Sequence, residues 1–182
     1  YARGGVVRRL SPDAAVVSVE DKTEGAACTA LLAAGYIDND EPLLILNGDE
    51  FLTVPFDGVI QNFVERELDG GTMTFKSVHP RYSFVRLDEQ NMVVEAAEKH
   101  PISDNATAGF YYFRQGRDFV RAAKNAIRKD ARHNNMFYVC PVYNEMVLEG
   151  KKIGIFPINA KDFHPIKSDR QLIELSVTEG DK

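Results

Sequence analysis

The sequence contains no tryptophan, only two cysteines, and no hydrophobic run that approaches the length of a membrane-spanning helix. Cys28 and Cys140 lie far apart, and neither has a second cysteine or a histidine at ligand spacing, which argues against a disulfide framework and against a zinc site. Isolated thiols suit a reducing compartment, so we expect a cytoplasmic protein. A bilayer crossing needs about 20 consecutive apolar residues, so no membrane partner is expected.

The chain also lacks an excess of positive charge. It carries 22 lysines and arginines against 27 aspartates and glutamates, and the net charge of -5 is spread over the sequence without long blocks. Such a distribution offers no electrostatic footprint for nucleic acid, so no nucleic-acid partner is expected. Hydrophobic residues make up 44% and charged residues 27%, proportions typical of a globular protein. We expect residues 1–182 to form a single domain with a substantial core.

Hydrophobic periodicity predicts alternating strands and helices in the first part of the chain. Segment 6–20 ends in AVVSVE, whose alternating β-branched residues predict a strand. Segment 23–35 is rich in alanine and leucine, which predicts a helix with Thr23 as its N-cap and Gly35 as its terminator. The run LLILN after Pro42 predicts a strand covered on both faces. This succession of strand, helix and strand indicates an α/β fold.

The same pattern continues through the remaining residues without an internal repeat or a linker. Further helices are predicted at 56–68, 117–129, 141–149 and 169–175. Further strands are predicted at 72–78, 83–87, 92–98, 109–113 and 152–158. The fold class is therefore α/β with a mixed sheet.

An acidic pair follows the strand LLILN. Asp49 and Glu50 lie just beyond its carboxyl end, where ligands gather in open α/β sheets. Gly48 lets the backbone turn, and the carboxylate of Asp49 is a suitable ligand for Mg²⁺, which prefers oxygen and shares it with substrate phosphates. An ordinary polar turn after a strand explains the same residues, and this alternative stays open.

A cluster of small residues opens the helix predicted at 23–35. Glu24, Gly25, Ala26 and Ala27 leave the backbone accessible, so a flat base or a phosphate would be able to approach it. Close packing of the helix explains glycine and alanine equally well, and the pattern alone does not decide between the two.

Six segments, in this order and spacing, resemble the bacterial sugar-phosphate nucleotidyltransferases, in particular the branch often found with capsule or surface-polysaccharide genes. They are TEGAACTALLA, IDNDEPLLILNGD, HPRYSFVRLDEQ, EAAEKHPIS, NATAGFYYFRQGRDFVRAA and MFYVCPVYNEM. The resemblance extends from about Val16 to Leu172. It implies a Rossmann-like layer of the glycosyltransferase-A type, with a mixed, mostly parallel sheet flanked by helices. It also implies that a nucleoside triphosphate and a sugar 1-phosphate are joined, with release of pyrophosphate and with Mg²⁺ as cofactor.

The resemblance also implies a role for each matching residue. The nucleotide would contact Glu24, Gly25, Ala26 and Ala27, and the metal would bind Asp49. The sugar would contact Glu98, Gly109 and Ser83, and its phosphate would meet Lys99. Asp49 and Lys99 would be the catalytic residues, because a divalent cation and an ammonium group offset the repulsion between two reacting anions. For Glu98 and Lys99, a solvated charge pair is the alternative.

Two departures from this family stand out. Its first strand and glycine-rich phosphate loop are absent, and the glycines after Arg3 precede the wrong strand to replace them. Pro165 stands where many relatives place a second magnesium aspartate, and Lys167 replaces a glycine. We therefore expect the chain as given to be inactive or severely impaired. The absence of this strand would leave backbone groups of its neighbours unpaired and exposed. We therefore expect either further polypeptide before Tyr1 or a homodimer that covers the gap.

Two other functions compete with nucleotidyl transfer. A catalytically degenerate member would bind a sugar nucleotide or sugar phosphate without turnover, which the missing loop and Pro165 favour. Glycosyl transfer on the same fold would need an Asp-x-Asp metal motif, which the NGDE segment matches only in part.

Overall fold

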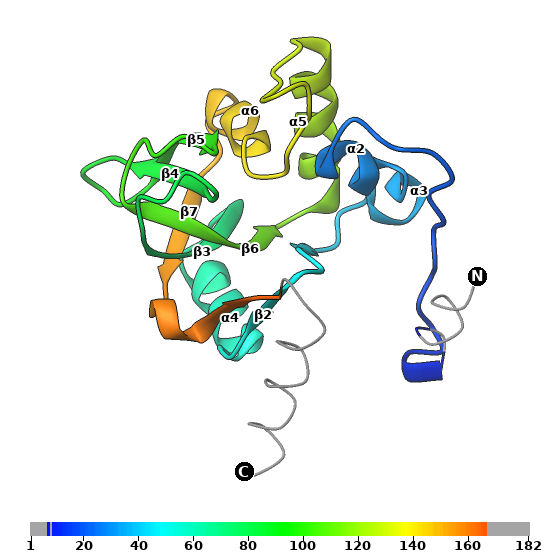
Figure 1. Ribbon diagram of the computed structural model, residues 1–182, viewed down its shortest axis with the longest axis horizontal. Helices are drawn as coiled ribbons and strands as arrows, with labels where there is room; N and C mark the ends of the chain where they lie inside the picture. Colours follow the sequence, from blue (N-terminus) through cyan, green and yellow to red (C-terminus); the bar gives the residue numbers. More distant parts are fainter. Residues whose placement is uncertain (1–6, 8, 167–182) are drawn as a thin grey trace.

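Within the described residues, the main sheet has six strands. The computed structural model describes residue 7 and residues 9–166 (Figure 1). The strands of this sheet are β1 (Leu43–Leu46), β3 (Gly70–Lys76), β4 (Ser83–Leu87), β5 (Val93–Glu98), β6 (Asn105–Phe113) and β7 (Ile153–Pro157). Their order is β5-β4-β6-β3-β7, and β1 also pairs with β6. A separate two-stranded sheet joins β2 (Glu50–Leu52) to β8 (Phe163–Pro165).

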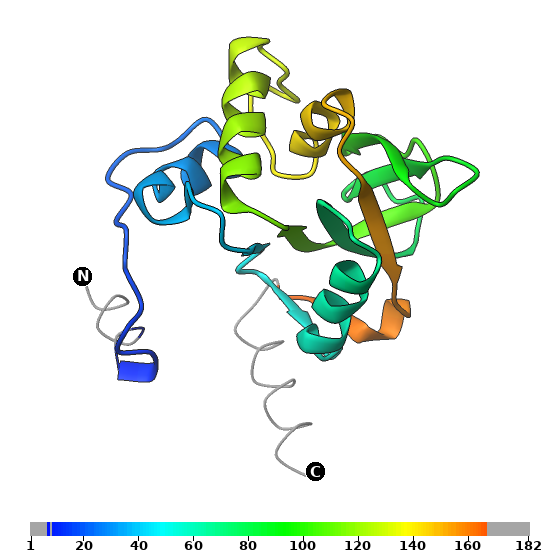
Figure 2. The same cartoon turned by 180° about the vertical axis from the view of Figure 1, so that it is seen from behind.

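Helices cover both faces of the main sheet. The helical elements are α2 (Ala26–Leu31), α3 (Ala34–Ile37), α4 (Phe56–Glu65), α5 (Gly116–Arg128), α6 (Val142–Leu148) and the 3₁₀ turn η1 (Ala160–Asp162). Helices α5 and α6 lie over one face and α4 lies over the other, as the front and back views agree (Figures 1 and 2). Each face has its own core, built around Phe119 and Tyr143 on one side and around Phe63 and Phe84 on the other. The expected α/β architecture is therefore confirmed.

The sheet is mixed, as expected, but the expectation of mostly parallel pairing is wrong for the described strands. Among them only β3 and β7 pair in parallel. Strand β6 runs antiparallel to β1, β3 and β4, and β4 runs antiparallel to β5. The short turn between β4 and β5 is the physical reason for the last pairing, because a parallel crossover needs a dozen or more residues.

The strand predicted at the AVVSVE segment does not form. Residues 14–20 adopt no regular secondary structure, and Val16, Val17 and Val19 are 37%, 40% and 46% exposed. A strand is stabilised by main-chain hydrogen bonds to a neighbour, and none of the described strands pairs with this segment. Propensity alone was therefore insufficient here.

The helix predicted at 23–35 is divided into α2 and α3, and Gly35 lies inside α3 rather than beyond the end of a helix. Thr23 is not the N-cap, because Gly25 occupies that position. The other predicted strands and α4, α5 and α6 are confirmed in place, with β6 beginning earlier than expected, at Asn105. Segment 169–175, Lys167 and the glycines after Arg3 lie outside the described residues. Within residues 7 and 9–166, no helix combines the length and apolar character needed to span a bilayer.

A gap in strand pairing along β6 positions the candidate site. Strand β1 pairs with the second half of β6, from Phe110 to Phe113, whereas β4 pairs with it at Ala106. The residues between these pairings include Gly109, whose φ of 62° is left-handed and kinks the strand. The carboxyl end of β1 and the first residue of β4 therefore face each other across this gap.

Candidate functional site

The loop after β1 delivers polar side chains to one side of the gap in β6. The main-chain N–H of Asn47 donates to the carbonyl of Gly109 at 2.9 Å, which holds the loop against the kinked strand. The side-chain amide of Asn47 then donates to Glu50 Oε2 at 3.1 Å. A Cβ atom on Gly109 would lie 1.6 Å from Glu50 Oε2, so only glycine leaves room for this carboxyl group.

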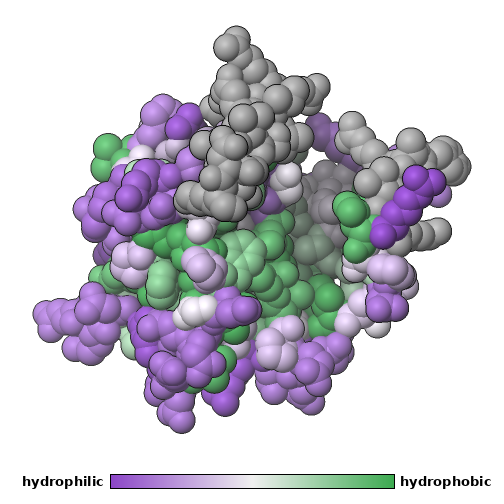
Figure 3. All heavy atoms as spheres, turned by 90° about the horizontal axis from the view of Figure 1, so that it is seen from below, coloured by the Kyte–Doolittle hydropathy of each residue, from purple (hydrophilic) through white to green (hydrophobic). Residues whose placement is uncertain are grey.

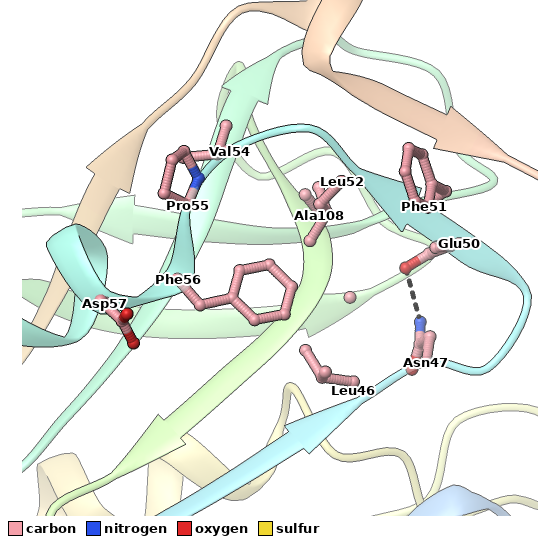
Figure 4. Close-up of a pocket in the computed structure, with 11 residues that line it drawn as sticks. Leu46, Asn47, Glu50, Phe51, Leu52, Val54, Pro55, Phe56, Asp57 and Ala108 are labelled. Atoms are coloured by element: carbon pink, nitrogen blue, oxygen red, sulfur yellow. Dashed lines mark hydrogen bonds between the residues drawn. The ribbon is translucent and has the colours of Figure 1, made fainter. Parts of the chain in front are cut away.

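Glu50 is the most perturbed carboxyl group near the gap. The pKa of Glu50 is raised to about 7, chiefly by burial and also by the negative charges of Asp49 and Glu98, while the hydrogen bond from Asn47 opposes the shift. Glu50 borders a pocket of about 590 Å³ whose other walls are largely apolar (Figure 4). The view from below shows hydrophobic surface bounded by hydrophilic side chains (Figure 3).

Ser83 and Glu98 form the opposite side of the gap. They are Cα partners in the antiparallel pairing of β4 and β5, and both are buried, with relative exposures of 9% and 8%. The Ser83 hydroxyl donates a short hydrogen bond to Glu98 Oε2. Burial raises the pKa of Glu98, and the hydrogen bond from Ser83 and the positive charge of Lys99 oppose that shift. The alternative of a solvated charge pair is therefore wrong for Glu98.

Lys99 leaves β5 in a left-handed conformation, with φ at 52°. Its side chain is exposed, and its ammonium group donates to the hydroxyl of Tyr138 at 3.0 Å. Glu98 and Lys99 both line a second pocket, of about 540 Å³, together with Arg132 and His133. The cations at this pocket favour an anionic ligand group.

Asp49 is exposed in the turn between β1 and β2, and its main-chain carbonyl accepts a hydrogen bond from Ile166 at 2.7 Å. Pro165, which replaces the second metal aspartate expected from the resemblance, is the Cα partner of Glu50 in the β2–β8 pairing. No group of three or more metal-binding side chains occurs among the described residues. One exposed carboxylate fits Mg²⁺ only in the mode where water and substrate phosphates supply most of the oxygen ligands.

The small-residue segment around Gly25 packs against the backbone of Phe137. Phe137 N–H donates to the carbonyl of Glu24 at 2.7 Å, and its carbonyl accepts from Ala27 N–H at 3.0 Å. A Cβ atom on Gly25 would lie 2.3 Å from the carbonyl oxygen of Phe137, so close packing is one reason for glycine here. Ala27 is buried, whereas Glu24 and Ala26 are exposed and accessible to a ligand.

The structure brings some of the expected residues together and separates others. Ser83, Glu98 and Gly109 meet around the gap in β6. The two pockets share no lining residue, and within the described part of the chain neither is lined by both Asp49 and Lys99. The metal and nucleotide assignments therefore remain predictions.

Sequence reasoning missed two residues near the site. Glu50 was treated as the neighbour of Asp49, although its own carboxyl group is the one that enters the gap. The sequence gives no local signal for Tyr138, whose hydroxyl contacts Lys99. Tyr143, in contrast, packs in the core: it is fully buried, and its hydroxyl donates to the carbonyl of Gly71 at 2.7 Å.

Comparisons with known proteins agree with this architecture. The family model described as nucleotidyl transferase matches residues 11–152. A nucleoside-diphosphate-sugar pyrophosphorylase from Vibrio cholerae RC9 aligns with a TM-score of 0.76 at 21% identity, covering 96% of this chain and 75% of its own. A proposed glucose-1-phosphate thymidylyltransferase from Bacillus anthracis, solved in complex with a sucrose, aligns with a TM-score of 0.72 at 15% identity. The alignment covers 97% of this chain and 71% of that protein. At these identities the two structures show the shared fold alone. No curated protein matched the chain.

Proposed function

The chain belongs to the nucleotidyl transferase family, and we propose that it transfers a nucleotidyl group from a nucleoside triphosphate to a sugar 1-phosphate. In this reaction an oxygen of the sugar phosphate forms a bond to the α-phosphorus. The bond between the α-phosphorus and the bridging oxygen breaks, and pyrophosphate leaves with that electron pair. No protein nucleophile is needed, so the residues bind, orient and neutralise the reactants.

One observation carries the proposal, namely the polar groups on the two sides of the gap in β6. Asn47 and Glu50 approach from the segment that joins β1 to β2, and Ser83 and Glu98 approach from the β4–β5 pair. A sugar presents several hydroxyl groups that need hydrogen-bond partners, and buried carboxylates accept such bonds strongly. Gly109 leaves the room that the Glu50 carboxyl group occupies, so this group lies against the strand, where it would be able to accept a hydrogen bond from a sugar hydroxyl.

Charged groups beyond the gap support the phosphate half of the reaction. We assign Lys99 to the phosphate of the sugar 1-phosphate, because Lys99 follows Glu98 in the sequence and lines the same pocket. We assign Glu24, Gly25, Ala26 and Ala27 to the nucleotide. Glu24 lies 3.2 Å from the guanidinium of Arg132, whose guanidinium stacks over the ring of Phe137. This contact connects the nucleotide segment to the pocket that Lys99 lines.

Asp49 is the residue that we propose to hold Mg²⁺. When bound, the cation would neutralise phosphate charge and so reduce the repulsion between the two substrates. Asp49 supplies a single carboxylate, so we expect the metal to bind together with the nucleotide rather than to the free protein.

A direct test is the release of pyrophosphate from a panel of nucleoside triphosphates and sugar 1-phosphates with Mg²⁺. We expect release to require both substrates and to be reduced at least tenfold by Glu98→Gln, which keeps the shape of the side chain but removes its charge. Glu95→Gln is the matched control, because Glu95 lies on the same strand and pairs with Arg86 at the surface. Equal activity of the two variants would remove Glu98 from the site.

A second candidate function is binding of a sugar nucleotide or sugar phosphate without turnover. The register that places Pro165 opposite Glu50 favours it, because no second carboxylate lies at that position to hold a metal. This candidate predicts a rise in Tm with a sugar nucleotide in the absence of any pyrophosphate release. Stabilisation without release would favour it, and release would exclude it.

We further propose that the product serves the synthesis of surface-polysaccharide precursors in the cytoplasm. The family resemblance of the segments around Asp49 and Glu98 supports the role in polysaccharide synthesis, and the two free cysteines are consistent with the cytoplasm.

In the described part of the chain β1 pairs only with β6, and Leu46 on β1 is 44% exposed. We propose a homodimer that covers this edge, which sedimentation velocity would detect.

A further inference from the structure

Tyr138 contacts the ammonium group of Lys99 through both its hydroxyl and its ring. Lys99 Nζ donates to the phenolic oxygen at 3.0 Å, and the same nitrogen lies 4.9 Å from the centroid of the ring. The hydroxyl of Tyr138 in turn donates to the sulfur of Met136 at 3.6 Å. Because its proton is directed to the sulfur, a lone pair of the phenolic oxygen faces Lys99.

The backbone around Tyr138 is held in place from both sides. Phe137 forms the two main-chain hydrogen bonds with the Glu24–Ala27 segment described above. His133 and Met136 exchange two further main-chain hydrogen bonds, at 2.9 and 3.0 Å, which close the preceding turn. The phenol of Tyr138 therefore projects from a fixed loop toward Lys99.

The Lys99 side chain, in contrast, has few other restraints. It is exposed and extends from a residue in the left-handed conformation, whose N–H donates to the carbonyl of Tyr82 at 3.0 Å. A free lysine side chain has many rotamers, so ordering it on binding a phosphate carries an entropic penalty. A partner that orders the ammonium before binding removes much of that penalty.

We infer that Tyr138 is a positioning residue that holds the Lys99 ammonium at the pocket it shares with Glu98 and Arg132, ready for a phosphate group. This inference rests on the proposed function for the identity of the ligand. An ammonium group has three donors. The bond to Tyr138 uses one, and two remain for phosphate oxygens. The hydrogen bond also raises the pKa of Lys99, which keeps the group charged.

The groups around Lys99 differ in whether they form a hydrogen bond with its ammonium group. Glu98 contributes negative charge, and His100, Arg132 and His133 contribute nitrogen-bearing side chains to the same pocket. Tyr138 is the described residue whose side chain forms a hydrogen bond with the Lys99 ammonium. Removal of its oxygen therefore tests the contact without changing any formal charge at neutral pH.

The test compares Tyr138→Phe with the wild-type chain. This variant keeps the aromatic ring and removes the phenolic oxygen. Tyr36→Phe is the matched control, because Tyr36 is 64% exposed. The first measurement is the NMR titration of the Lys99 side chain, which needs no ligand. We expect a lower pKa of Lys99 in Tyr138→Phe and an unchanged one in Tyr36→Phe. The same pKa of Lys99 in all three proteins would overturn the inference.

The second measurement is the calorimetric affinity for α-D-glucose 1-phosphate and for inorganic phosphate. We expect both to fall about 3- to 10-fold in Tyr138→Phe, the range expected for one hydrogen bond. In a Lys99→Gln background the Tyr138→Phe change should have no further effect, because Tyr138 acts through Lys99. An equal loss in both backgrounds would contradict the inference. If wild type binds neither probe, the proposed function loses support, and the NMR titration still decides the role of Tyr138.

Discussion

The hydroxyl of Ser83 donates a hydrogen bond to the buried carboxylate of Glu98 on the neighbouring strand. This bond offsets part of the unfavourable burial of that charge and fixes the direction of the carboxylate. Because the two residues are in register, the bond also aligns the ends of β4 and β5 beside the gap in β6. The site thus depends on strand pairing as well as on the identity of its side chains.

Ser83→Ala should leave the Glu98 carboxylate without its donor. We expect a loss of about 1–3 kcal/mol in the free energy of unfolding, the range for a buried polar group deprived of its partner. The pKa of Glu98 should rise further, because the lost bond favoured the ionised form. Urea unfolding and an NMR titration of Glu98 measure the two effects. Ser11→Ala, at an exposed serine, should change neither, and a stable Ser83→Ala with unchanged Glu98 would contradict the assignment.

Gly109→Ala should reduce stability and ligand affinity more than the same change at another left-handed glycine. A methyl group at Gly109 meets Glu50 Oε2, whereas no described atom lies within 4 Å of a Cβ at Gly150, which has a φ of 77°. Both variants carry the left-handed strain of about 1–2 kcal/mol. Only Gly109→Ala should also displace Glu50 and weaken the calorimetric affinity for α-D-glucose 1-phosphate. Equal losses of stability and affinity in the two variants would refute a role for this close contact.

Gly25→Ala should push Phe137 away from the nucleotide segment. The added Cβ would lie 2.3 Å from the carbonyl oxygen of Phe137, so we expect the free energy of unfolding to fall by about 1–3 kcal/mol, as at other overpacked sites. Gly35→Ala is the control, because Gly35 lies in α3 with open space around it. There the change should stabilise by about 0.5–1 kcal/mol, since alanine favours helix over glycine. Urea unfolding of both variants checks the opposite signs.

Stability should fall as the pH rises between about 4.5 and about 7. The pKa of Glu50 is raised from 4.5 to about 7, so over this window the folded chain binds more protons than the unfolded chain. Proton binding that favours the folded state is lost as the pH increases. Glu50→Gln should reduce this dependence, and Glu89→Gln, at an exposed glutamate, should preserve it. Urea midpoints at pH 5 and pH 8 with EDTA present provide the test, and an unaltered slope in Glu50→Gln would contradict the burial of this carboxyl group.

Long, strongly patterned segments could be predicted from the sequence. LLILN predicted the position of β1, although the expected cover on both faces is wrong, because its residues are half-buried and Leu46 is exposed. Segment 117–129 predicted α5 because its apolar residues recur at helical spacing. Strands β2 and β8 were missed, because three residues are too few to show a period. The AVVSVE segment was assigned wrongly, because a strand depends on a partner that local sequence does not reveal.

The candidate site was predictable only in part. The position of Glu98 followed from the resemblance, and its pairing with Ser83 gives that position a physical basis. The burial of Glu50 depends on the β2–β8 pairing and on the kink at Gly109, which join segments far apart in the sequence. The contact between Tyr138 and Lys99 depends on a left-handed backbone at Lys99, for which the sequence gives no local signal.

The most direct test of the proposed chemistry is the Mg²⁺-dependent shift in Tm with a nucleoside triphosphate, measured for the wild-type chain, Asp49→Asn and the exposed control Asp13→Asn. If Asp49 holds the metal between protein and nucleotide, Mg²⁺ should add to the stabilisation by nucleotide in wild type and Asp13→Asn, and should add nothing in Asp49→Asn. The same Mg²⁺-dependent shift in all three proteins would contradict this account.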